Sequence, residues 1–392
     1  MTDPFDACSR PGRLESGRPV WRTSADGEDA AGVRRSSGDR TVAGWLFLCA
    51  ALVLGLSLLG GATRLSGSGL SMVDWEPVRG TIPPLTEEAW EEEFSAYRSS
   101  PEYRLRNRGL DLDGFRRIFW VEYAHRLLAR TVGVTFVVPL VVFGIRRRLP
   151  RADLLPLAAL FVVGAGQGLL GWLMVRSGLV DRPHVSAYRL AAHLVLGASL
   201  FAGLLWLALD HWRGIRAPLV RVRSPGGASW LFGGCLAFLF VSGAFMAGTG
   251  AGHAYRTFPL IAGELLPPGL GRLEPWWRNP FENLVAVHLF HRGAALLALI
   301  AGVGLGWRGR RLRGRILPGS RFGVLVGTLI LQVGLGATTL VLGAPPALAG
   351  VHQAGAFAVL AAWVVLHHGL ASSPPGGVAK PDSASITVHV EG

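Results

Sequence analysis

The chain has 392 residues, of which 50% are hydrophobic and only 17% are charged, and its formal net charge is +13. A composition this apolar, with a mean hydropathy of +0.37, excludes an ordinary soluble protein of this length. The basic charge alone would be consistent with a nucleic-acid partner. Because the arginines cluster between apolar segments, as in membrane proteins, we expect a lipid bilayer as the surroundings and no nucleic-acid partner.

Uncharged stretches long enough to cross a bilayer recur along the chain, since a spanning helix needs roughly 20 apolar residues. Two of the spans reach that length only if the polar segments "EYAHRLLAR" (122–130) and "HLFHR" (288–292) belong to them. The break between the last two spans is supplied by "GAPPALAG" (343–350). Eight transmembrane helices are predicted, at about 42–62, 118–144, 154–175, 189–209, 228–248, 285–306, 322–342 and 349–369.

Basic segments follow the second, fourth and sixth spans, namely "RRRLPR" (146–151), the arginines of 213–223 and "RGRRLRGR" (308–315). Because arginine concentrates in cytoplasmic loops, these segments and both termini are predicted to be cytoplasmic. Residues 1–40 and 371–392 are rich in polar and small residues, and we expect disordered tails there. The expected location is the bacterial inner membrane, in preference to the mitochondrial one.

The order of the motifs indicates an internal repeat. Three motifs recur in the same order: "VEYAHR" as "HLFHR", "GQGLLGWLMV" (166–175) as "LQVGLGATTLVLG" (331–343), and "AAHLVLGA" (191–198) as "GVHQAGAF" (350–357). Four helices return the chain to its starting side, so both halves run in the same direction. The predicted fold is an all-α integral membrane protein with eight transmembrane helices in two tandem four-helix bundles, a parallel internal repeat. The bundles are expected at 41–210, with a long outer loop at 63–117, and at 228–370, with a cytoplasmic linker at 211–227.

Four histidines lie in the first turns of the even-numbered spans, and therefore at one depth near the outer face: His125, His193, His291 and His352. An ionisable side chain at membrane depth is unfavourable and usually marks a site. Neutral imidazoles on facing helices hold haem iron axially, which predicts one haem between His125 and His193 and another between His291 and His352. The alternative is that these histidines hydrogen-bond between helices. His288 shares a helix face with His291 and is an alternative ligand.

Other residues near these histidines have predicted roles as well. Arg126 and Arg292 directly follow two of the histidines and are candidate contacts for haem propionates. Small residues would let a flat ring lie close to a backbone: Gly164, Gly166, Gly168, Gly334 and Gly336. Three further histidines lie at inner helix ends, where we expect them at the membrane–water interface: His211, His367 and His368.

Glu122 distinguishes the two halves. It precedes His125 by one helical turn, whereas His288 stands at the equivalent place in the second half. A carboxylate beside one predicted haem and not the other indicates an acid–base or charge-stabilising group at a reacting haem. The alternative is an interfacial ion pair with Arg126 or Arg130.

Several segments resemble those of a known family, the haem A synthases of the mitochondrial and alphaproteobacterial type. They include "GGATRLSGSGLSMVDWEPVRGTIPP" (60–84), "EYAHR" (122–126), "YRLAAHL" (188–194) and "FENLVAVHLFHR" (281–292). The resemblance extends over residues 42–370, and "TRLSGSGLSMVDW" and "YRLAAHL" are its most specific motifs.

The resemblance implies an oxidoreductase that oxidises a methyl group of haem O to formyl by successive hydroxylations, giving haem A for terminal oxidase assembly. It implies that His125 and His193 ligate the substrate haem, with Glu122 catalytic. It also implies that His291 and His352 ligate a haem b cofactor. The implied partners are haem O, the haem O synthase and an electron donor, with a homo-oligomer left open.

The chain departs from the family pattern at a few positions. His288 stands where the family pattern has Gln, and Ala129 stands where it has Gly. The first outer loop holds no cysteine pair, which fits the mitochondrial-like type. Within this loop, "EEAWEEEFSAYRSS" (87–100) predicts an amphipathic helix with an apolar face. This helix is either a lid over the porphyrin site or a plain surface helix.

Two other functions compete with haem A synthesis. One is a di-haem cytochrome b-type electron-transfer subunit in which both haems are permanent. The other is a transporter built on a repeat, with the histidines as proton relays. Bound porphyrin would separate the transporter from the other two, and the chemical identity of the pigments would separate the enzyme from the electron carrier.

Overall fold

The computed structural model describes residues 39–73, 79–179, 185–214, 226–311 and 319–372. In these residues there is no strand, and eight helices are long and apolar enough to cross a membrane. They are α1 (Arg40–Leu65), α4 (Leu112–Ile145), α5 (Arg151–Leu179), α6 (Ala187–Arg213), α7 (Gly227–Thr249), α10 (Leu284–Arg311), α11 (Gly319–Val341) and α12 (Pro346–Ala371). The prediction of an all-α membrane protein with eight transmembrane helices is confirmed.

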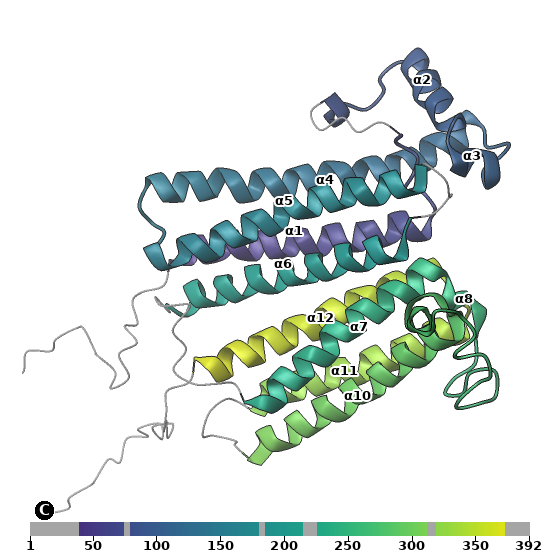
Figure 1. The fold of residues 1–392 in the computed structure, drawn as a ribbon. Coiled ribbons are helices and arrows are strands. Elements are labelled where there is room, and N and C mark those ends of the chain that lie inside the picture. Colours follow the sequence, from purple (N-terminus) through teal and green to yellow (C-terminus); the bar gives the residue numbers. More distant parts are fainter. Residues whose placement is uncertain (1–38, 74–78, 180–184, 215–225, 312–318, 373–392) are drawn as a thin grey trace, which may run out of the picture.

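The helices lie in two groups, which Figure 1 shows one above the other. In the N-terminal group, α1 packs against α4 and α6, and α5 packs against α6. In the C-terminal group, α10 packs against α7 and α11, and α11 packs against α12. The groups meet where α6 lies against α7 and α12, and where α12 lies against α1. The two groups differ in two respects. Helices α4 and α5 scarcely touch one another whereas α10 and α11 are closely packed, and α1 packs closely against α6 whereas α7 and α12 have few contacts.

The two ends of the bundle carry different segments. Helix α1 begins and α12 ends at one end, here called the terminal end (Figure 1). The opposite, capped end carries the short helices α2 (Glu87–Arg98), α3 (Pro101–Leu105) and α8 (Ala251–Ala254). The predicted tails lie almost wholly outside the described residues, as does most of the predicted linker, of which residues 215–225 are not described.

Helix α4 begins before its apolar segment does. Asp111 caps it, because a side-chain oxygen of Asp111 accepts a hydrogen bond from the backbone N–H of Gly114 at 2.8 Å. The segment between α1 and α4 is therefore 66–111, shorter at both ends than the predicted loop 63–117. Hydropathy defines only the part of a helix that crosses the lipid, so this polar extension could not be predicted from it.

The predicted amphipathic helix in this segment is confirmed as α2. Its apolar residues Trp90, Phe94 and Tyr97 are buried, and they face the extension of α4. The ring centroids of Trp90 and Phe119 are 4.9 Å apart, and those of Phe94 and Phe115 are 5.2 Å apart. Edge-to-face and offset pairs at such distances are the favourable aromatic geometries, so α2 is fixed to α4 at the capped end. A role as a lid stays a prediction.

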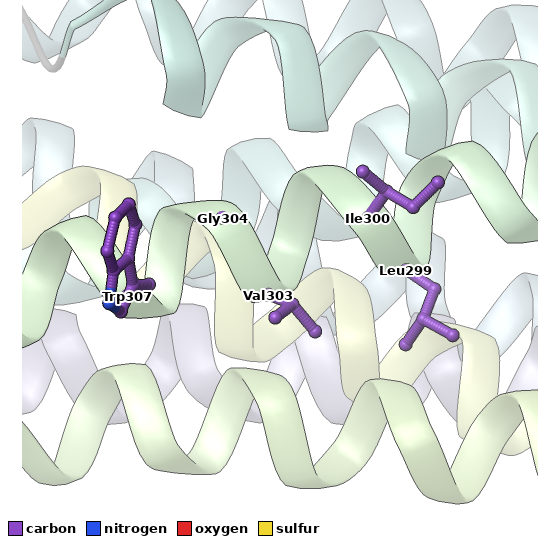
Figure 2. Close-up of a pocket in the computed structure, with 5 residues that line it drawn as sticks. All are labelled: Leu299, Ile300, Val303, Gly304 and Trp307. Carbon is purple, nitrogen blue, oxygen red and sulfur yellow. The ribbon is translucent and has the colours of Figure 1, made fainter.

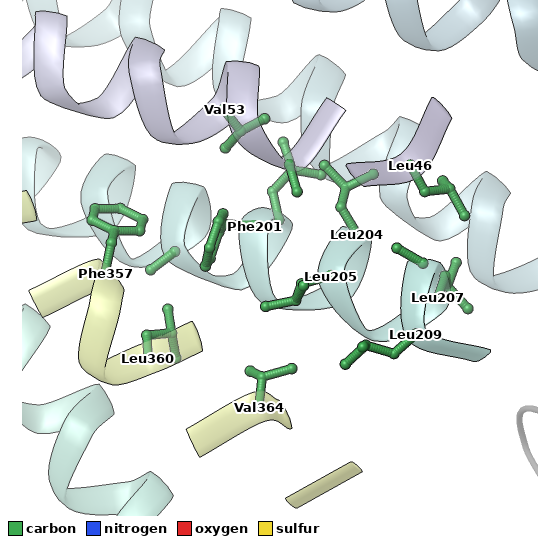
Figure 3. Close-up of a cluster of buried hydrophobic side chains, with 14 of the residues drawn as sticks. Leu46, Val53, Phe201, Leu204, Leu205, Leu207, Leu209, Phe357, Leu360 and Val364 are labelled. Carbon is green, nitrogen blue, oxygen red and sulfur yellow. The ribbon is translucent and has the colours of Figure 1, made fainter. Parts of the chain in front are cut away.

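The largest buried apolar cluster lies where the two groups meet. Figure 3 shows side chains of α1, α6 and α12 that point into it, among them Leu46, Val53, Phe201, Leu204, Leu205, Phe357, Leu360 and Val364. The rings of Phe201 and Phe357 meet edge-on with centroids 5.4 Å apart. Lipid tails are as apolar as leucine, so close packing and dispersion stabilise this interface, and removal from water contributes little.

A buried hydrogen bond between a carboxylate and an imidazole joins the groups at the terminal end. Oδ1 of Asp210 on α6 lies 2.8 Å from Nε2 of His368 on α12, and the two side chains are 2% and 0% exposed. Nδ1 of His368 lies 2.7 Å from a guanidinium nitrogen of Arg213. Both ring nitrogens of His368 therefore have partners on α6, and these hydrogen bonds fix α12 against that helix.

Two further histidines at this end are buried in the same way. Nε2 of His211 lies 3.0 Å from Oδ2 of Asp153 on α5, and Nδ1 of His367 lies 2.8 Å from the hydroxyl of Ser229 on α7. His211, His367 and His368 lie at helix ends as expected, but all three are buried between helices. Their depth at the membrane–water interface stays a prediction. Their partners come from other helices, which a reading along the chain does not bring together.

Candidate functional site

The four histidines predicted as ligands occupy matched positions. His125, His193, His291 and His352 are half-buried and lie near the capped ends of α4, α6, α10 and α12 respectively. His125 and His193 are close enough to interact electrostatically, and so are His291 and His352. The structure therefore brings the residues together in the two pairs that the sequence predicts.

Each histidine ring rests against a glycine of a neighbouring helix. The distances from Cε1 of the ring to a Cβ built on the glycine are 2.9 Å for His125 and Gly60, 3.4 Å for His193 and Gly171, 3.4 Å for His291 and Gly243, and 2.7 Å for His352 and Gly336. Glycine lets a helix approach closely, and any larger residue would displace the ring at the two shortest contacts. The same arrangement recurs four times, at matched places in the two groups.

The sequence predicted only one of these glycines. Gly336 was among the five small residues named for a flat ring, but the others in that set do not contact a histidine. Gly168 and Gly334 face open space, while Gly164 and Gly166 face leucines of α6. Gly171 could have been found from the repeat, because it occupies in "GQGLLGWLMV" the place that Gly336 occupies in the matching motif.

Two glutamines support the histidines of α6 and α12. Nε2 of Gln167 donates a hydrogen bond to the backbone carbonyl of His193 at 2.9 Å. Nε2 of Gln332 donates to the carbonyl of His352 at 2.8 Å. The two glutamines stand at equivalent places of the repeated motif, yet their role depends on helix packing and was not predicted. Each holds the helix backbone at the point from which the imidazole projects.

Three of the four imidazoles have a buried nitrogen with no hydrogen-bond partner. These are the Nδ1 atoms of His125, His193 and His352. Nδ1 of His291 lies 2.9 Å from the hydroxyl of Ser242, which can fix the orientation of the ring. Buried polar atoms in proteins are almost always hydrogen-bonded, so three imidazoles with an unpartnered Nδ1 at matched positions indicate side chains built to bind something else.

The alternative ligand His288 is engaged by the protein. Its side chain is fully buried, and Nε2 lies 2.6 Å from the backbone carbonyl oxygen of Ala251. Nδ1 lies 3.4 Å from a guanidinium nitrogen of Arg292. Because both ring nitrogens have partners, the geometry favours His291 as the ligand of this group.

Glu122 is almost wholly buried, and both of its oxygens accept hydrogen bonds. Oε1 pairs with Arg126, whose Nη2 lies 2.7 Å away and whose Nε lies 3.1 Å away. Oε2 accepts from the backbone N–H and hydroxyl of Ser71 and from the N–H of Met72. The ion pair with Arg126 that the sequence left as an alternative is therefore present. Donors from Arg126, Ser71 and Met72 therefore fix the position of this carboxylate.

The two arginines predicted to bind propionates have protein partners in this structure. Nη2 of Arg126 also donates to the carbonyl of Met72 at 2.8 Å. One guanidinium nitrogen of Arg292 donates to the carbonyls of Pro259 and Leu260, at 3.0 Å each. Nε of Arg292 is buried without a partner. Both cations lie beside the histidine pairs, at the capped end.

No group of three or more metal-ligating side chains occurs in the described part of the chain. The histidine pairs therefore do not resemble a site for a bare metal ion, which takes more ligands from the protein. A shallow apolar hollow of about 610 Å³ lies on α10, lined by Leu299, Ile300, Val303, Gly304 and Trp307 (Figure 2). None of the four histidines lines it.

Comparison with known proteins identifies the family. The model of the COX15-CtaA family, described as cytochrome oxidase assembly protein, matches residues 43–364. A protein of Nitrosospira multiformis named heme A synthase is 42% identical over 339 residues, which cover 84% of this chain and 94% of that protein. Proteins with the same name from two other bacteria are similarly close.

The relative in Parvibaculum lavamentivorans is 43% identical over 335 residues, covering 85% of this chain and 95% of that protein. The relative in Caulobacter vibrioides is 42% identical over 329 residues, covering 83% and 95%. The resemblance stated from the sequence motifs is confirmed, and the chain belongs to the COX15-CtaA family of cytochrome oxidase assembly proteins.

Proposed function

We propose that this protein is a haem A synthase, a membrane oxidoreductase that converts haem O into haem A for cytochrome oxidase assembly. Relatives that carry this name match it over nearly their whole length. The observation that carries the proposal is the set of four imidazoles, each against a glycine and arranged as two pairs. The two imidazoles of one pair would be enough to hold a haem at each site.

The residues present fit haem at both sites. Three imidazoles have buried unpartnered nitrogens, and the surroundings are apolar. Bound haem would supply the redox chemistry. The protein would contribute the axial ligands, the glutamines that support two of them, and cations for the propionates. For the second role we propose Arg126 and Arg292, and the unpartnered Nε of Arg292 supports this assignment.

We assign the substrate haem O to His125 and His193, and haem b to His291 and His352. Two differences between the groups support this assignment. The hydroxyl of Ser242 orients His291, and α10 packs closely against α11, as a permanent cofactor requires. The matching helices α4 and α5 scarcely touch. Weak packing between these helices would let a substrate enter and leave the site.

Glu122 is the proposed catalytic group, because it lies one turn from His125 and has no counterpart in the other group. In the resting arrangement its negative charge is held by Arg126 and by the donors of Ser71 and Met72. A buried carboxylate in this place can stabilise positive charge that develops during oxidation of the methyl group, or accept a proton at Oε1 if Arg126 turns toward a propionate.

The proposed setting is the bacterial inner membrane with both termini in the cytoplasm, which the arginine-rich segments at the terminal end support. The capped end then faces outward. The proposed partners are the haem O synthase, which makes the substrate, and an electron donor, with self-association as a homo-oligomer.

The test is expression of the full chain together with a source of haem O, followed by extraction and identification of the pigments. Haem A or its hydroxylated precursors, found together with haem b, is the expected result. Haem b alone would favour a di-haem electron-transfer subunit. A purified protein without a Soret band, despite an adequate porphyrin supply, would leave only functions that need no haem, such as transport.

A further inference from the structure

One polar contact crosses the interface between α12 and α1 near the histidines. Gln353 follows His352 on α12, and its Nε2 donates a hydrogen bond to the backbone carbonyl of Ser57 on α1 at 2.8 Å. A Cβ built on Gly61 would lie 2.1 Å from Oε1 of Gln353. The amide therefore fills a space that only glycine at position 61 leaves open.

This contact links the two histidine sites. On α12, Gln353 is the direct neighbour of His352. On α1, Ser57 and Gly61 flank Gly60, against which the ring of His125 rests. A short run of covalent and packing contacts thus leads from a ligand of the C-terminal group to a ligand of the N-terminal group.

The equivalent interface in the same molecule lacks this contact. Gly60 and Gly243 hold equivalent histidines, so Ala244 of α7 corresponds to Gly61 of α1. Leu194 follows His193 as Gln353 follows His352, and Leu194 packs in one apolar cluster with Ala244. The architecture can therefore be built with an apolar pair at this place. A partly buried amide is unfavourable unless it is hydrogen-bonded, which indicates that Gln353 has a role beyond packing.

We propose that Gln353 is a positioning residue that fixes α12 against α1 and thereby sets the separation of the two haem sites. The inference rests on the proposed function, to which it adds that electrons cross from the haem b site to the substrate site. The protein controls that crossing through the distance between the irons. The amide hydrogen bond defines one register between the helices, whereas an apolar contact would permit small shifts.

The test uses the full chain loaded with both haems and compares Gln353→Leu with Gly61→Ala. The first variant removes the amide, and the second displaces it without changing Gln353. Gly55→Ala on the same helix is the matched control, because a Cβ there meets nothing within 4 Å. A double variant, Gly61→Ala with Gln353→Leu, rebuilds the apolar pair of the equivalent interface and provides a packed protein if a single variant fails to fold.

Three quantities are measured: the content of each haem, the magnetic interaction between the two ferric irons by low-temperature electron paramagnetic resonance, and the yield of haem A. We expect full haem content, an altered iron–iron interaction and a yield lower by roughly tenfold or more, since small misplacements of reacting groups have effects of this size. The control variant should match the wild type in all three measurements.

Two results would overturn the inference. One is an unchanged iron–iron interaction and yield in the variants. The other is loss of one haem only, which would make Gln353 a support of a single site. Failure of the proposed function is distinguishable from both, because the wild type itself would then lack the two haems or make no haem A.

Discussion

Oε2 of Glu122 accepts hydrogen bonds from both the backbone N–H and the hydroxyl of Ser71, at 2.8 Å and 2.7 Å. This contact fastens the segment that follows α1 to the part of α4 that carries His125. The motif "TRLSGSGLSM" and the motif "EYAHR" are far apart in the chain, yet they form one structural unit around a single carboxylate.

The role of Glu122 is best tested with glutamine. Replacement by alanine would leave Arg126 buried without its partner, and breaking such a pair destabilises a protein by about 3–5 kcal/mol. We expect Glu122→Gln to bind both haems and to lower the yield of haem A by about 100-fold or more, the range of general acid–base effects. Pigment analysis of the purified variant measures both quantities.

Ser71→Ala is the control for this experiment. It removes one hydrogen bond, worth about 1 kcal/mol, and keeps the carboxylate. Its yield of haem A should stay near that of the wild type. If Ser71→Ala loses product formation and Glu122→Gln retains it, the carboxylate has a structural role only.

Substitutions of His291 and His288 should show which of the two binds haem and which only contacts protein groups. His291→Ala should lose the haem of the C-terminal group, because it removes the proposed ligand. His288→Gln should keep this haem, since both nitrogens of His288 already bind protein groups. Haem-to-protein stoichiometry and the low-spin optical spectrum measure the effect. Loss of haem in His288→Gln with a normal spectrum in His291→Ala would reverse the assignment.

Replacing a glycine beside an imidazole by alanine should weaken haem binding. The effect should be larger where the added Cβ would lie closer to the histidine ring. Gly336→Ala would place a Cβ 2.7 Å from Cε1 of His352, whereas at Gly334 on the same helix a Cβ meets nothing within 4 Å. We expect Gly336→Ala to weaken haem binding in the C-terminal group by roughly 10- to 100-fold, as for other changes that misorient a ligand. Gly334→Ala should bind haem normally. Titration of the haem-free protein with haem gives both affinities, and equal affinities would contradict the prediction.

The buried pair at the terminal end should contribute to stability without affecting the haems. Asp210→Asn replaces a hydrogen bond to a charged group by a neutral one, and hydrogen bonds to charged groups contribute about 1.5–3 kcal/mol. The midpoint of thermal unfolding should therefore fall, while the optical spectra of bound haem stay unchanged. Replacing His368 as well should recover part of the loss. A changed haem spectrum would show that this end of the bundle communicates with the histidines.

Glu102 in α3 should make the capped end sensitive to pH. Burial, and then the negative charge of Glu122, raises the pKa of Glu102 to about 7. Between the ordinary value of 4.5 and about 7, the folded state keeps a proton that the unfolded state releases. The free energy of unfolding therefore falls as pH rises through this window. Above it, the contribution of Glu102 to that free energy no longer changes with pH.

Limited proteolysis of α2 and α3 across this window measures the effect. Cleavage of the wild type should become faster as pH rises, because local opening becomes less unfavourable. Glu102→Gln should show little dependence on pH, since it carries no titrating proton. An equal pH dependence in the variant would assign the effect to another group.

The elements that follow from one-dimensional patterns could be predicted from the sequence. Uncharged runs located all eight spans, and the alternating direction of the spans placed His125, His193, His291 and His352 at one end. Groups whose role depends on a partner from another helix could not be predicted. Asp210 and His368 are charged or polar residues at helix ends, and nothing near them in the chain indicates that they pair. The partners of Glu122 other than Arg126, namely Ser71 and Met72, depend in the same way on how the segment after α1 folds back.

Helix α12 is attached to the N-terminal group at both of its ends, by Gln353 on α1 and by His368 on α6. These two contacts restrain α12 from moving away from the N-terminal group. The seam between the two groups is therefore closed to a molecule as broad as a tetrapyrrole. Substrate and product would instead enter and leave from the lipid bilayer between α4 and α5, the two helices of the N-terminal group that scarcely touch.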